Sequence, residues 1–504
     1  MRTFQLYERG KSAVENPGGV HTRLVLGFLA ALIVLRAAVA AYAPLAFDEA
    51  YYWLWSKHLA AGYLDHPPLI AFAIRLGTAV FGDTQFGVRA VPLVLLIAAS
   101  WAVWRSGASL LQSKSGGALA ALLFNLTLMV NIEGLVATPD APAMAEAAFF
   151  VFFLVKVAET EQGVWWLAVG AAGGFALISK YTAPFLGAGA LLWLLVSRKE
   201  RHWLGSVWPY LGAALALAMF APVVMWNAEH GWISFAMQFG RVGSGGFTLR
   251  YLGEFLAGQL GLATPFVAVL GAVGLLRIVH PRATPTPLVL IAAIIAPAAL
   301  YFLWHSLHDR VQGNWPSFLY PAFSIAAAAT WNARGQGAGA RMVRWSQYAA
   351  VPVASVLTLV VYVHVFWPLV PLQGLRDPIA RLLAVGYQPV ADKIDDLRQQ
   401  AGARAIITTS YAQTGWLVFY LPSHPPVVQL NERERWLNEP PPAADMFVGP
   451  LLYVTEDWRD EKELIAARFG QVTQLARIPR LRSGQVIEEY VVYRVSGPKA
   501  AVLN

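Results

Sequence analysis

Cysteine is absent from this 504-residue chain, and charged residues make up only 13% of it. The first absence excludes disulfide bonds, thiolate metal sites and a cysteine nucleophile. The second, together with a hydrophobic fraction of 57%, excludes an ordinary soluble domain, because the apolar segments recur too often for a soluble fold to bury them. The sequence also lacks a G-x-x-x-x-G-K-[ST] phosphate-binding loop. It therefore predicts a polytopic α-helical membrane protein.

The net charge of +8 comes largely from short loops between apolar segments. In a soluble chain this excess would suggest nucleic-acid binding. In this pattern it indicates membrane topology instead, because cytoplasmic loops are rich in Lys and Arg. We therefore expect no nucleic-acid partner. Residues 1–21 are too polar for the core of a signal peptide and are interpreted as a cytoplasmic tail.

About eleven segments are apolar and long enough to cross a ~30 Å hydrocarbon core, which takes a helix of ~20 residues. They make up the predicted membrane domain, residues 22–370. The predicted spans are 22–43, 88–105, 116–132, 141–158, 164–179, 182–197, 207–226, 251–276, 286–305, 316–332 and 347–369.

The distribution of basic residues predicts the orientation of these spans. A cytoplasmic N-terminus puts the loops with Arg105 and Lys114, and with Arg198 and Lys199, in the cytoplasm, as the positive-inside rule requires. An odd number of spans then leaves the C-terminus outside. The loops predicted on the outer face are 44–87, 133–140, the turn at Lys180, 227–250 and 306–315. The unusual polar clusters in the first two-thirds of the chain all fall on this face.

The first outer loop, 44–87, is the predicted reaction centre. Two adjacent carboxylates, Asp48 and Glu49, follow directly after the first apolar segment, where charge is tolerated better than inside lipid. Ala50–Ala61 and Leu69–Phe81 are amphipathic and are predicted to be two interfacial helices. Pro67–Pro68 separates them, because proline cannot continue a helix.

After residue 370 the composition becomes more polar, and residues 374–497 are predicted to form an α/β domain outside the membrane. Helical stretches are expected at Pro378–Ala401 and Asp460–Phe469. Short runs rich in β-forming residues predict the strands. The strand candidates are Ala405–Thr409, Gly415–Tyr420, Val427–Leu430, Met446–Val454 and Val486–Val495.

Five motifs on the predicted outer face carry a family resemblance. They are F-D-E-A-Y-Y-W at Phe47–Trp53, D-H-P-P at Asp65–Pro68, T-P-D-A-P at Thr138–Pro142, S-K-Y at Ser179–Tyr181 and N-W-P at Asn314–Pro316. Together they resemble the GT-C glycosyltransferases, and more narrowly the bacterial relatives of protein O-mannosyltransferases that include the aminoarabinose and galacturonic acid transferases of lipid A. The resemblance covers essentially the whole chain.

The resemblance implies a multi-pass enzyme of the bacterial inner membrane. Such an enzyme takes a sugar from a polyprenyl-phosphate carrier and passes it to an acceptor on the periplasmic face, where the C-terminal domain also lies. The implied partners are membrane lipids, the polyprenyl-phosphate sugar, and lipid A, lipopolysaccharide or another envelope glycan. No cofactor is expected.

Sugar transfer to a hydroxyl needs a base, and Asp48 is the candidate, because desolvation at the edge of an apolar site would raise its pKa from ~4 into a useful range. If the acceptor is a phosphate, Asp48 instead positions it or stabilises oxocarbenium charge. Glu49 is expected to orient Asp48 or to bind the acceptor. Asp140 is a third catalytic candidate, with a helix N-cap as the alternative.

The departing phosphate needs cations or hydrogen-bond donors. Lys180 and Arg310 are the basic candidates, although Lys180 could instead extend to the membrane interface. His66 and Tyr63 are candidate donors, with a role in the turn as the alternative for His66. Sugar or acceptor contacts are assigned to Tyr52, Trp53, Asp65 and Asn314.

A metal site could draw on His305, His308 and Asp309, a spacing that is common by chance, with Asp48, Asp65 and His66 as further ligand candidates. Because relatives of the polyprenyl-monophosphate branch resemble metal-independent enzymes, no obligatory metal is expected.

The identity of the sugar stays open. His66 stands where aminoarabinose transferases carry Lys, and D-E-A-Y-Y-W is closer to the galacturonic acid transferases. A protein O-mannosyltransferase is the alternative within the enzyme class. A lipid or sugar transporter is the alternative outside it, and would be expected to carry inverted repeats with polar residues at the bilayer midplane. The polar clusters lie on one face instead, which favours the enzyme.

Overall fold

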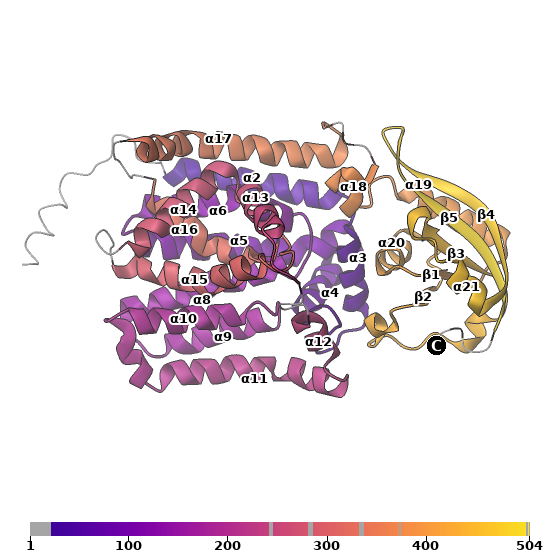
Figure 1. Ribbon diagram of the computed structural model, residues 1–504, viewed down its shortest axis with the longest axis horizontal. Helices are drawn as coiled ribbons and strands as arrows, with labels where there is room; N and C mark the ends of the chain where they lie inside the picture. Colours follow the sequence, from indigo (N-terminus) through magenta and orange to yellow (C-terminus); the bar gives the residue numbers. More distant parts are fainter. Residues whose placement is uncertain are drawn as a thin grey trace, which may run out of the picture.

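The computed structural model describes residues 22–240, 245–280, 286–331, 337–370, 372, 374–499 and 502. A bundle of helices occupies one end of its long axis, and a smaller sheet-containing part occupies the other (Figure 1). We call this second part the C-terminal α/β region, residues 374–499. The predicted cytoplasmic tail, 1–21, lies outside the described residues.

The bundle is built from the apolar segments of the sequence. Its main helices are α2 (Thr22–Tyr42), α5 (Gln85–Leu110), α6 (Lys114–Leu126), α7 (Leu128–Glu133), α8 (Asp140–Thr160), α9 (Trp165–Leu177), α10 (Pro184–Val196), α11 (Trp208–Glu229), α12 (Ile233–Phe239), α13 (Arg250–Leu262), α14 (Pro265–Val279), α15 (Val289–His305), α16 (Tyr320–Ala329) and α17 (Ala338–Phe366). Among the described residues, five helices are long and apolar enough to cross a membrane, or six if α13 and α14 form one broken span. The prediction of a helical membrane protein is confirmed, and the count of eleven spans stays a prediction.

Two predicted spans are not single helices, and in both places the break has a local cause. Residues 116–132 divide at Thr127, which is extended and whose hydroxyl accepts from the amide of Val130 to cap α7. Residues 251–276 divide between α13 and α14, which meet at 107°. Pro265 starts α14 there, and the residue before a proline is driven out of helical geometry.

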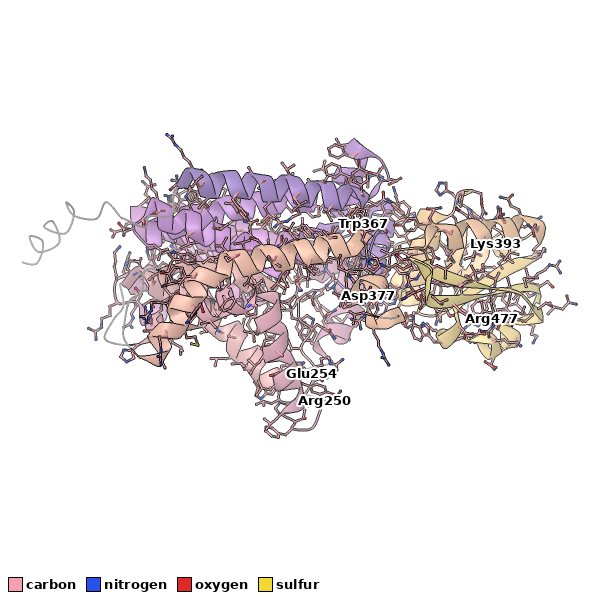
Figure 2. All side chains as sticks on the ribbon, turned by 90° about the horizontal axis from the view of Figure 1, so that it is seen from above. Arg250, Glu254, Trp367, Asp377, Lys393 and Arg477 are labelled. Atoms are coloured by element: carbon pink, nitrogen blue, oxygen red, sulfur yellow. The ribbon has the colours of Figure 1, made fainter. Side chains whose placement is uncertain are left out.

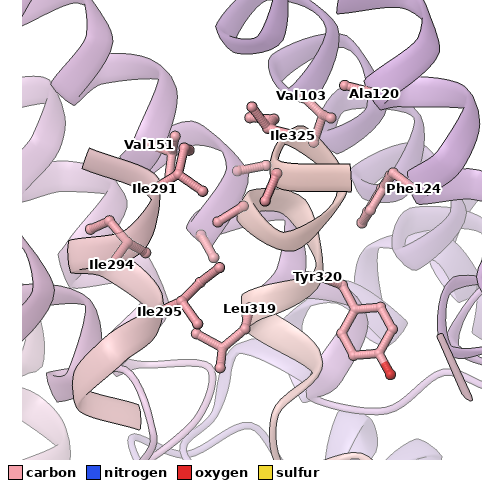
Figure 3. Close-up of a cluster of buried hydrophobic side chains, with 14 of the residues drawn as sticks. Val103, Ala120, Phe124, Val151, Ile291, Ile294, Ile295, Leu319, Tyr320 and Ile325 are labelled. Carbon is pink, nitrogen blue, oxygen red and sulfur yellow. The ribbon is translucent and has the colours of Figure 1, made fainter. Parts of the chain in front are cut away.

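The core of the bundle is apolar and closely packed. Figure 3 shows part of it, where Val103 of α5, Phe124 of α6, Val151 of α8 and Ile325 of α16 gather with residues of α15. Glycine allows α9 and α11 to approach closely: a Cβ on Gly170 would lie 2.1 Å from the carbonyl oxygen of Gly212. Small residues at helix crossings are typical of membrane bundles, where dispersion contacts hold helices together.

Two short helices lie between the bundle and the C-terminal α/β region (Figure 1). The second, α4 (Leu69–Phe81), has the predicted bounds. The first, α3 (Phe47–Lys57), begins at Phe47 rather than Ala50 and ends at Lys57 rather than Ala61. Nearly all of α3 is buried, so its rings are covered by protein rather than by the lipid–water boundary that the sequence suggested. The aromatic stripe of α3 is an internal packing surface.

The C-terminal α/β region contains one five-stranded sheet in the order β2-β1-β3-β5-β4. Strand β1 is parallel to β2 and β3, whereas β5 is antiparallel to β3 and β4. The strands are β1 (Ile406–Thr408), β2 (Val427–Gln429), β3 (Leu451–Glu456), β4 (Phe469–Arg482) and β5 (Gln485–Pro498). The helices of this region are α18 (Pro378–Leu382), α19 (Gln388–Gln400), α20 (Tyr411–Tyr420) and α21 (Lys462–Arg468).

The predicted strand Gly415–Tyr420 is wrong, because these residues belong to α20. The hydroxyl of Ser410 accepts from the amide of Gln413 at the start of this helix, and Trp416 and Leu417 are buried on it. Aromatic and aliphatic residues favour strands in general, but here tertiary packing overrides that tendency. Strand β4 was not predicted, because its apolar residues are interrupted by Gln, Thr and Arg.

Candidate active site

Asp48 lies in the first turn of α3 and is half-buried. The hydroxyl of Tyr411, on α20, donates to its Oδ1 at 3.3 Å. Burial, and next the carboxylate of Asp65, raise the pKa of Asp48 to about 7, against the opposing effects of Tyr411 and Arg435. A carboxyl group that titrates near neutral pH is suited to accept a proton during a reaction.

Asp65 is held by groups from three parts of the chain. The hydroxyl of Tyr51 donates to its Oδ2 at 3.0 Å, and Nη1 of Arg435 lies 2.7 Å from the same oxygen. Arg435 belongs to the short helix η5 (Arg433–Trp436) of the C-terminal α/β region. Gln238 of α12 donates to the backbone oxygen of Asp65 at 2.7 Å. The role of Asp65 as a sugar or acceptor contact stays a prediction, and in the structure its carboxylate belongs to the charge network around Asp48.

Glu49, the neighbour of Asp48, is fully buried and has a different set of contacts. Arg89 of α5 reaches both of its carboxylate oxygens, at 2.7 and 2.6 Å. The backbone amides of Ala46 and Ala137 also donate to Glu49, each at 2.8 Å. Glu49 therefore joins the start of α3 to α5 and to the loop 133–140.

A second polar cluster forms around Asp140 and Lys180. The ammonium group of Lys180 pairs with Oδ1 of Asp140, which also accepts from the hydroxyl of Ser317. Nδ2 of Asn314 donates to the other oxygen of Asp140 at 2.8 Å, and the backbone oxygen of Asn314 accepts from Lys180 at 3.3 Å. The structure thus brings together three residues predicted from three separate motifs.

The alternative of a simple helix N-cap for Asp140 is wrong, because α8 begins at Asp140 itself with Pro139 at the cap position. The side chain of Lys180 is buried with that of Asp140, so Lys180 does not extend to the surface of the protein. A buried ion pair of this kind persists only when further hydrogen bonds satisfy it, and Asn314 and Ser317 supply them.

The two clusters belong to one region of the molecule. The amide of Leu69, which starts α4, donates to the backbone oxygen of Ile178 at 2.9 Å, two residues before Lys180. Helix α12 contacts Asp65 through Gln238, and its Ser234 bonds the hydroxyl of Tyr181, the residue after Lys180, at 2.7 Å. These contacts join the turn at Lys180 and helix α12 to the polar segment between α3 and α4, so we refer to these residues together as the polar region.

Of the predicted aromatic and histidine contacts, Tyr52 and His66 lie near each other, whereas Trp53 and Tyr63 bond other parts of the chain. The ring of Tyr52 lies 6.1 Å from that of His66, on the side of α3 that carries Asp48. The indole of Trp53 instead donates to Asp83 at 2.7 Å, away from Asp48. The hydroxyl of Tyr63 bonds the backbone at Trp55, His58 and Ala60, and burial raises its pKa to about 12. Tyr63 thus closes a turn in this structure.

Arg310 is exposed and pairs with Glu254 at 2.9 Å, apart from the Asp140–Lys180 cluster. Figure 2 shows Glu254 and Arg250 on a helix that projects from the bundle.

The histidines considered for a metal site are held by aromatic rings. His305 is buried between the rings of Tyr301 and Trp315, whereas the ring of His308 lies 5.0 Å from Trp304. Within the residues that the structure describes, no three His, Asp or Glu side chains group to hold a metal ion. The expectation of metal independence stays a prediction.

Four residues of the site were missed by sequence reasoning: Arg89, Ser317, Tyr411 and Arg435. A signal existed for Arg89, because a charged residue just inside a predicted span is rarely without a partner. The other three have common side chains in unremarkable surroundings, and only the packing of distant segments brings them to Asp48 or Asp140.

Parts of this chain are similar in sequence to known proteins. A family model described as dolichyl-phosphate-mannose-protein mannosyltransferase matches residues 65–226. The lipid A galacturonosyltransferase RgtD of Rhizobium johnstonii is 25% identical over 285 residues, or 56% of this chain and 59% of RgtD. The chain therefore matches less than two thirds of that relative's length.

The crystal structure of ArnT from Cupriavidus metallidurans bound to undecaprenyl phosphate matches 95% of this chain and 100% of ArnT, with a TM-score of 0.63 and 15% identity. The chain has the ArnT fold. The apo state of ArnT gives nearly the same TM-score, 0.62. The resemblance to GT-C glycosyltransferases that the motifs carry is confirmed by the family model, by the similarity to RgtD and by the fold taken together.

Proposed function

We propose that this protein is a glycosyltransferase that moves a monosaccharide from a polyprenyl-phosphate carrier to lipid A or another cell-envelope glycan. The observation that carries the proposal is the position of Asp48, a carboxyl group with a pKa of about 7, at the same end of an ArnT-fold bundle as the buried Asp140–Lys180 pair. The similarity to RgtD supports a lipid A acceptor. By the predicted topology, this end faces the periplasm and the N-terminus lies in the cytoplasm.

Asp48 supplies the base in this proposal. It accepts the proton of the acceptor hydroxyl while the hydroxyl oxygen bonds to the anomeric carbon of the sugar. The bond between that carbon and the carrier phosphate breaks, and the phosphate leaves with the electron pair. Where the acceptor group is itself a phosphate, it is already anionic, and Asp48 positions it. The rings of Tyr51, Tyr52 and Trp55 exclude water beside Asp48.

Lys180 is the proposed cation for the carrier phosphate. It is already held beside Asp140 and Asn314, so it does not have to be ordered when the substrate binds. His66 lies at the start of the same polar region and would add a donor. Arg310 would have to move from Glu254 to take part.

An apolar cavity of about 390 Å³ supports a lipid-linked donor. It lies among α8, α9, α10 and α11, with Leu177 and Pro184 near one end and Leu204 near the other. Leu177 and Pro184 flank the turn that carries Lys180. A polyprenyl chain in this cavity would therefore have its phosphate close to Lys180, with its apolar tail among apolar side chains.

The test uses the purified full-length protein in nanodiscs, with a panel of polyprenyl-phosphate sugars and three acceptors: lipid A, an envelope glycan extract and a Ser/Thr-rich peptide. Transfer is scored by mass spectrometry. We expect sugar on lipid A with wild type, and a loss of about 100-fold or more with Asp48→Asn, the range for removing a general base. Asp396→Asn, at an exposed aspartate of α19, is the matched control and should keep activity.

Each other outcome has a definite meaning. Sugar on the peptide alone would replace the lipid acceptor by a protein and favour a protein O-mannosyltransferase. Equal activity of wild type and Asp48→Asn would keep the transferase and reject Asp48 as its base. Absence of transfer from every donor would reject the proposed function.

A further inference from the structure

Arg435 connects the C-terminal α/β region to the carboxylate of Asp65, in the loop between α3 and α4. Its side chain is only 12% exposed, and its Nη1 lies 2.7 Å from Oδ2 of Asp65. Its Nε lies 2.7 Å from Glu432, which holds the guanidinium from the opposite side. The guanidinium carbon also lies 4.5 Å from the ring centroid of Tyr411, a cation–π contact.

The charge of Arg435 acts on Asp48 directly, and its contacts reach Asp48 through two neighbouring side chains as well. Arg435 orders the ring of Tyr411, whose hydroxyl donates to Asp48 at 3.3 Å. It also balances the charge of Asp65, whose carboxylate acts on Asp48 electrostatically. The ring of Tyr51 completes the arrangement, since it lies 4.9 Å from Tyr411 and its hydroxyl bonds Asp65.

We propose that Arg435 is a positioning residue of the reaction centre, which fixes the place and the charge of Asp48 through Asp65 and Tyr411. The inference rests on the proposed function, because it takes Asp48 as the base. It makes the C-terminal α/β region a part of the active site rather than a separate module for acceptor binding.

The groups that change the pKa of Asp48 belong to different elements of the structure, so single substitutions can separate their effects on that pKa. Asp65 of the α3–α4 loop and Glu49 of α3 raise its pKa, whereas Arg435 of η5 and the hydrogen bond from Tyr411 of α20 lower it. Tyr52 of α3 lies on the same side and is neutral near pH 7, since burial raises its own pKa well above the usual range. Removing Arg435 or removing the charge of Asp65 should therefore move the pKa of Asp48 in opposite directions.

The experiment measures kcat/KM against pH for full-length Arg435→Gln and Asp65→Asn in nanodiscs. We expect the acid limb of the profile to move to higher pH in Arg435→Gln and to lower pH in Asp65→Asn, by about one unit each, as charges at this range produce. The double variant should return towards the wild-type profile. Arg433→Gln is the matched control, because Arg433 belongs to the same short helix but bonds the backbone of Gln429; its limb should not move.

Two further variants keep the test decisive if Arg435→Gln does not fold. Tyr411→Phe retains the ring under the guanidinium and removes the bond to Asp48, so its acid limb should move to higher pH. Arg435→Lys keeps the charge but loses the planar contact with Tyr411, so it should lower kcat while its limb stays close to that of wild type.

The two proposals fail in different ways. If wild type transfers no sugar, the proposed function is wrong. If wild type is active and Asp48→Asn is inactive, but the Arg435 and Asp65 variants lose rate equally at every pH, Arg435 has a structural role only and the inference is overturned.

Discussion

At the residue scale, Asp48 and Glu49 show how two adjacent carboxylates acquire different properties. Asp48 is half-buried beside another carboxylate and receives one neutral hydrogen bond, so its ionised form is disfavoured. Glu49 is fully buried but pairs with Arg89 and two backbone amides. The first arrangement suits proton transfer, and the second suits a structural support.

The pH dependence of transfer should follow Asp48. Because a base must be deprotonated to act and the pKa of Asp48 is about 7, kcat/KM should fall about tenfold per unit below that pH and level off above it. The measurement is a pH profile from 5 to 9 with a lipid acceptor that does not titrate in this range. A profile that stays flat down to pH 5, as a carboxyl group with the ordinary aspartate pKa of ~4 would give, would contradict the assignment.

Folding stability provides the control for this profile. An acid whose pKa is raised by folding favours the folded state most when it is protonated, so its contribution falls as pH rises from ~4 towards 7. Asp48→Asn should therefore be at least as stable as wild type at pH 8. Loss of its activity there would then reflect chemistry, which thermal unfolding in the same nanodiscs would verify.

Lys180 should matter for both stability and activity. Lys180→Met leaves Asp140 buried and without its cation, and removing one partner of a buried pair costs about 3–5 kcal/mol. The unfolding temperature and the transfer rate should both fall. In Lys180→Met combined with Asp140→Asn, most of the stability should return but not the activity, because the phosphate still lacks its cation. Recovery of both would show that the pair has a structural role only.

At the element scale, the loop 133–140 depends on Glu49. This carboxylate holds the amide of Ala137 and the start of α3, while Arg89 ties both to α5. The same loop ends at Asp140 of the second cluster. This short loop therefore links Glu49, at the start of α3, to the Asp140–Lys180 cluster.

Glu49→Ala should destabilise the fold by about 3–5 kcal/mol, because it leaves Arg89 buried without its counter-ion. Glu49→Gln keeps an acceptor oxygen and should cost less. Thermal unfolding of both variants measures the difference. If Glu49→Ala unfolds like wild type but loses transfer, Glu49 binds the acceptor, as one of the two roles expected from the sequence.

At the scale of the whole molecule, the candidate active site lies where the helical bundle and the C-terminal α/β region meet. Helix α20 packs on α3, with the hydroxyl of Tyr420 accepting from the amide of Leu45 at 2.8 Å. Gly415 allows the contact, since a Cβ there would lie 3.0 Å from the amide nitrogen of Tyr51. The position of Tyr411 over Asp48 depends on this approach.

Gly415→Val should therefore wedge α20 away from α3. We expect kcat to fall roughly 10- to 100-fold, since small displacements of catalytic groups have effects of this size, while membrane insertion is unchanged. Gly253→Val in α13 is the matched control, because an added Cβ there meets nothing within 4 Å. Transfer assays and limited proteolysis between the two parts give the readout. Full activity of Gly415→Val would show that close docking is not needed.

The sequence by itself determined the membrane class, the position in the chain of the loop after the first apolar helix, and the bounds of α4. These follow from local properties: the length of apolar runs against the thickness of a bilayer, the period of a helix and the effect of proline. It also predicted Asp140, Lys180 and Asn314 as site residues on one face of the membrane, although it did not predict that their side chains bond one another.

Tertiary structure alone decided that Glu49 pairs with Arg89 and that the pKa of Asp48 is raised. It also decided that Tyr411 and Arg435 reach the centre, across sequence separations of 363 and 370 residues. Such contacts depend on how α20 and η5 pack against α3, and their energy is shared among many side chains. No local sequence pattern predicts that packing. The free energy of burying an apolar segment, in contrast, depends on the length and composition of that segment alone.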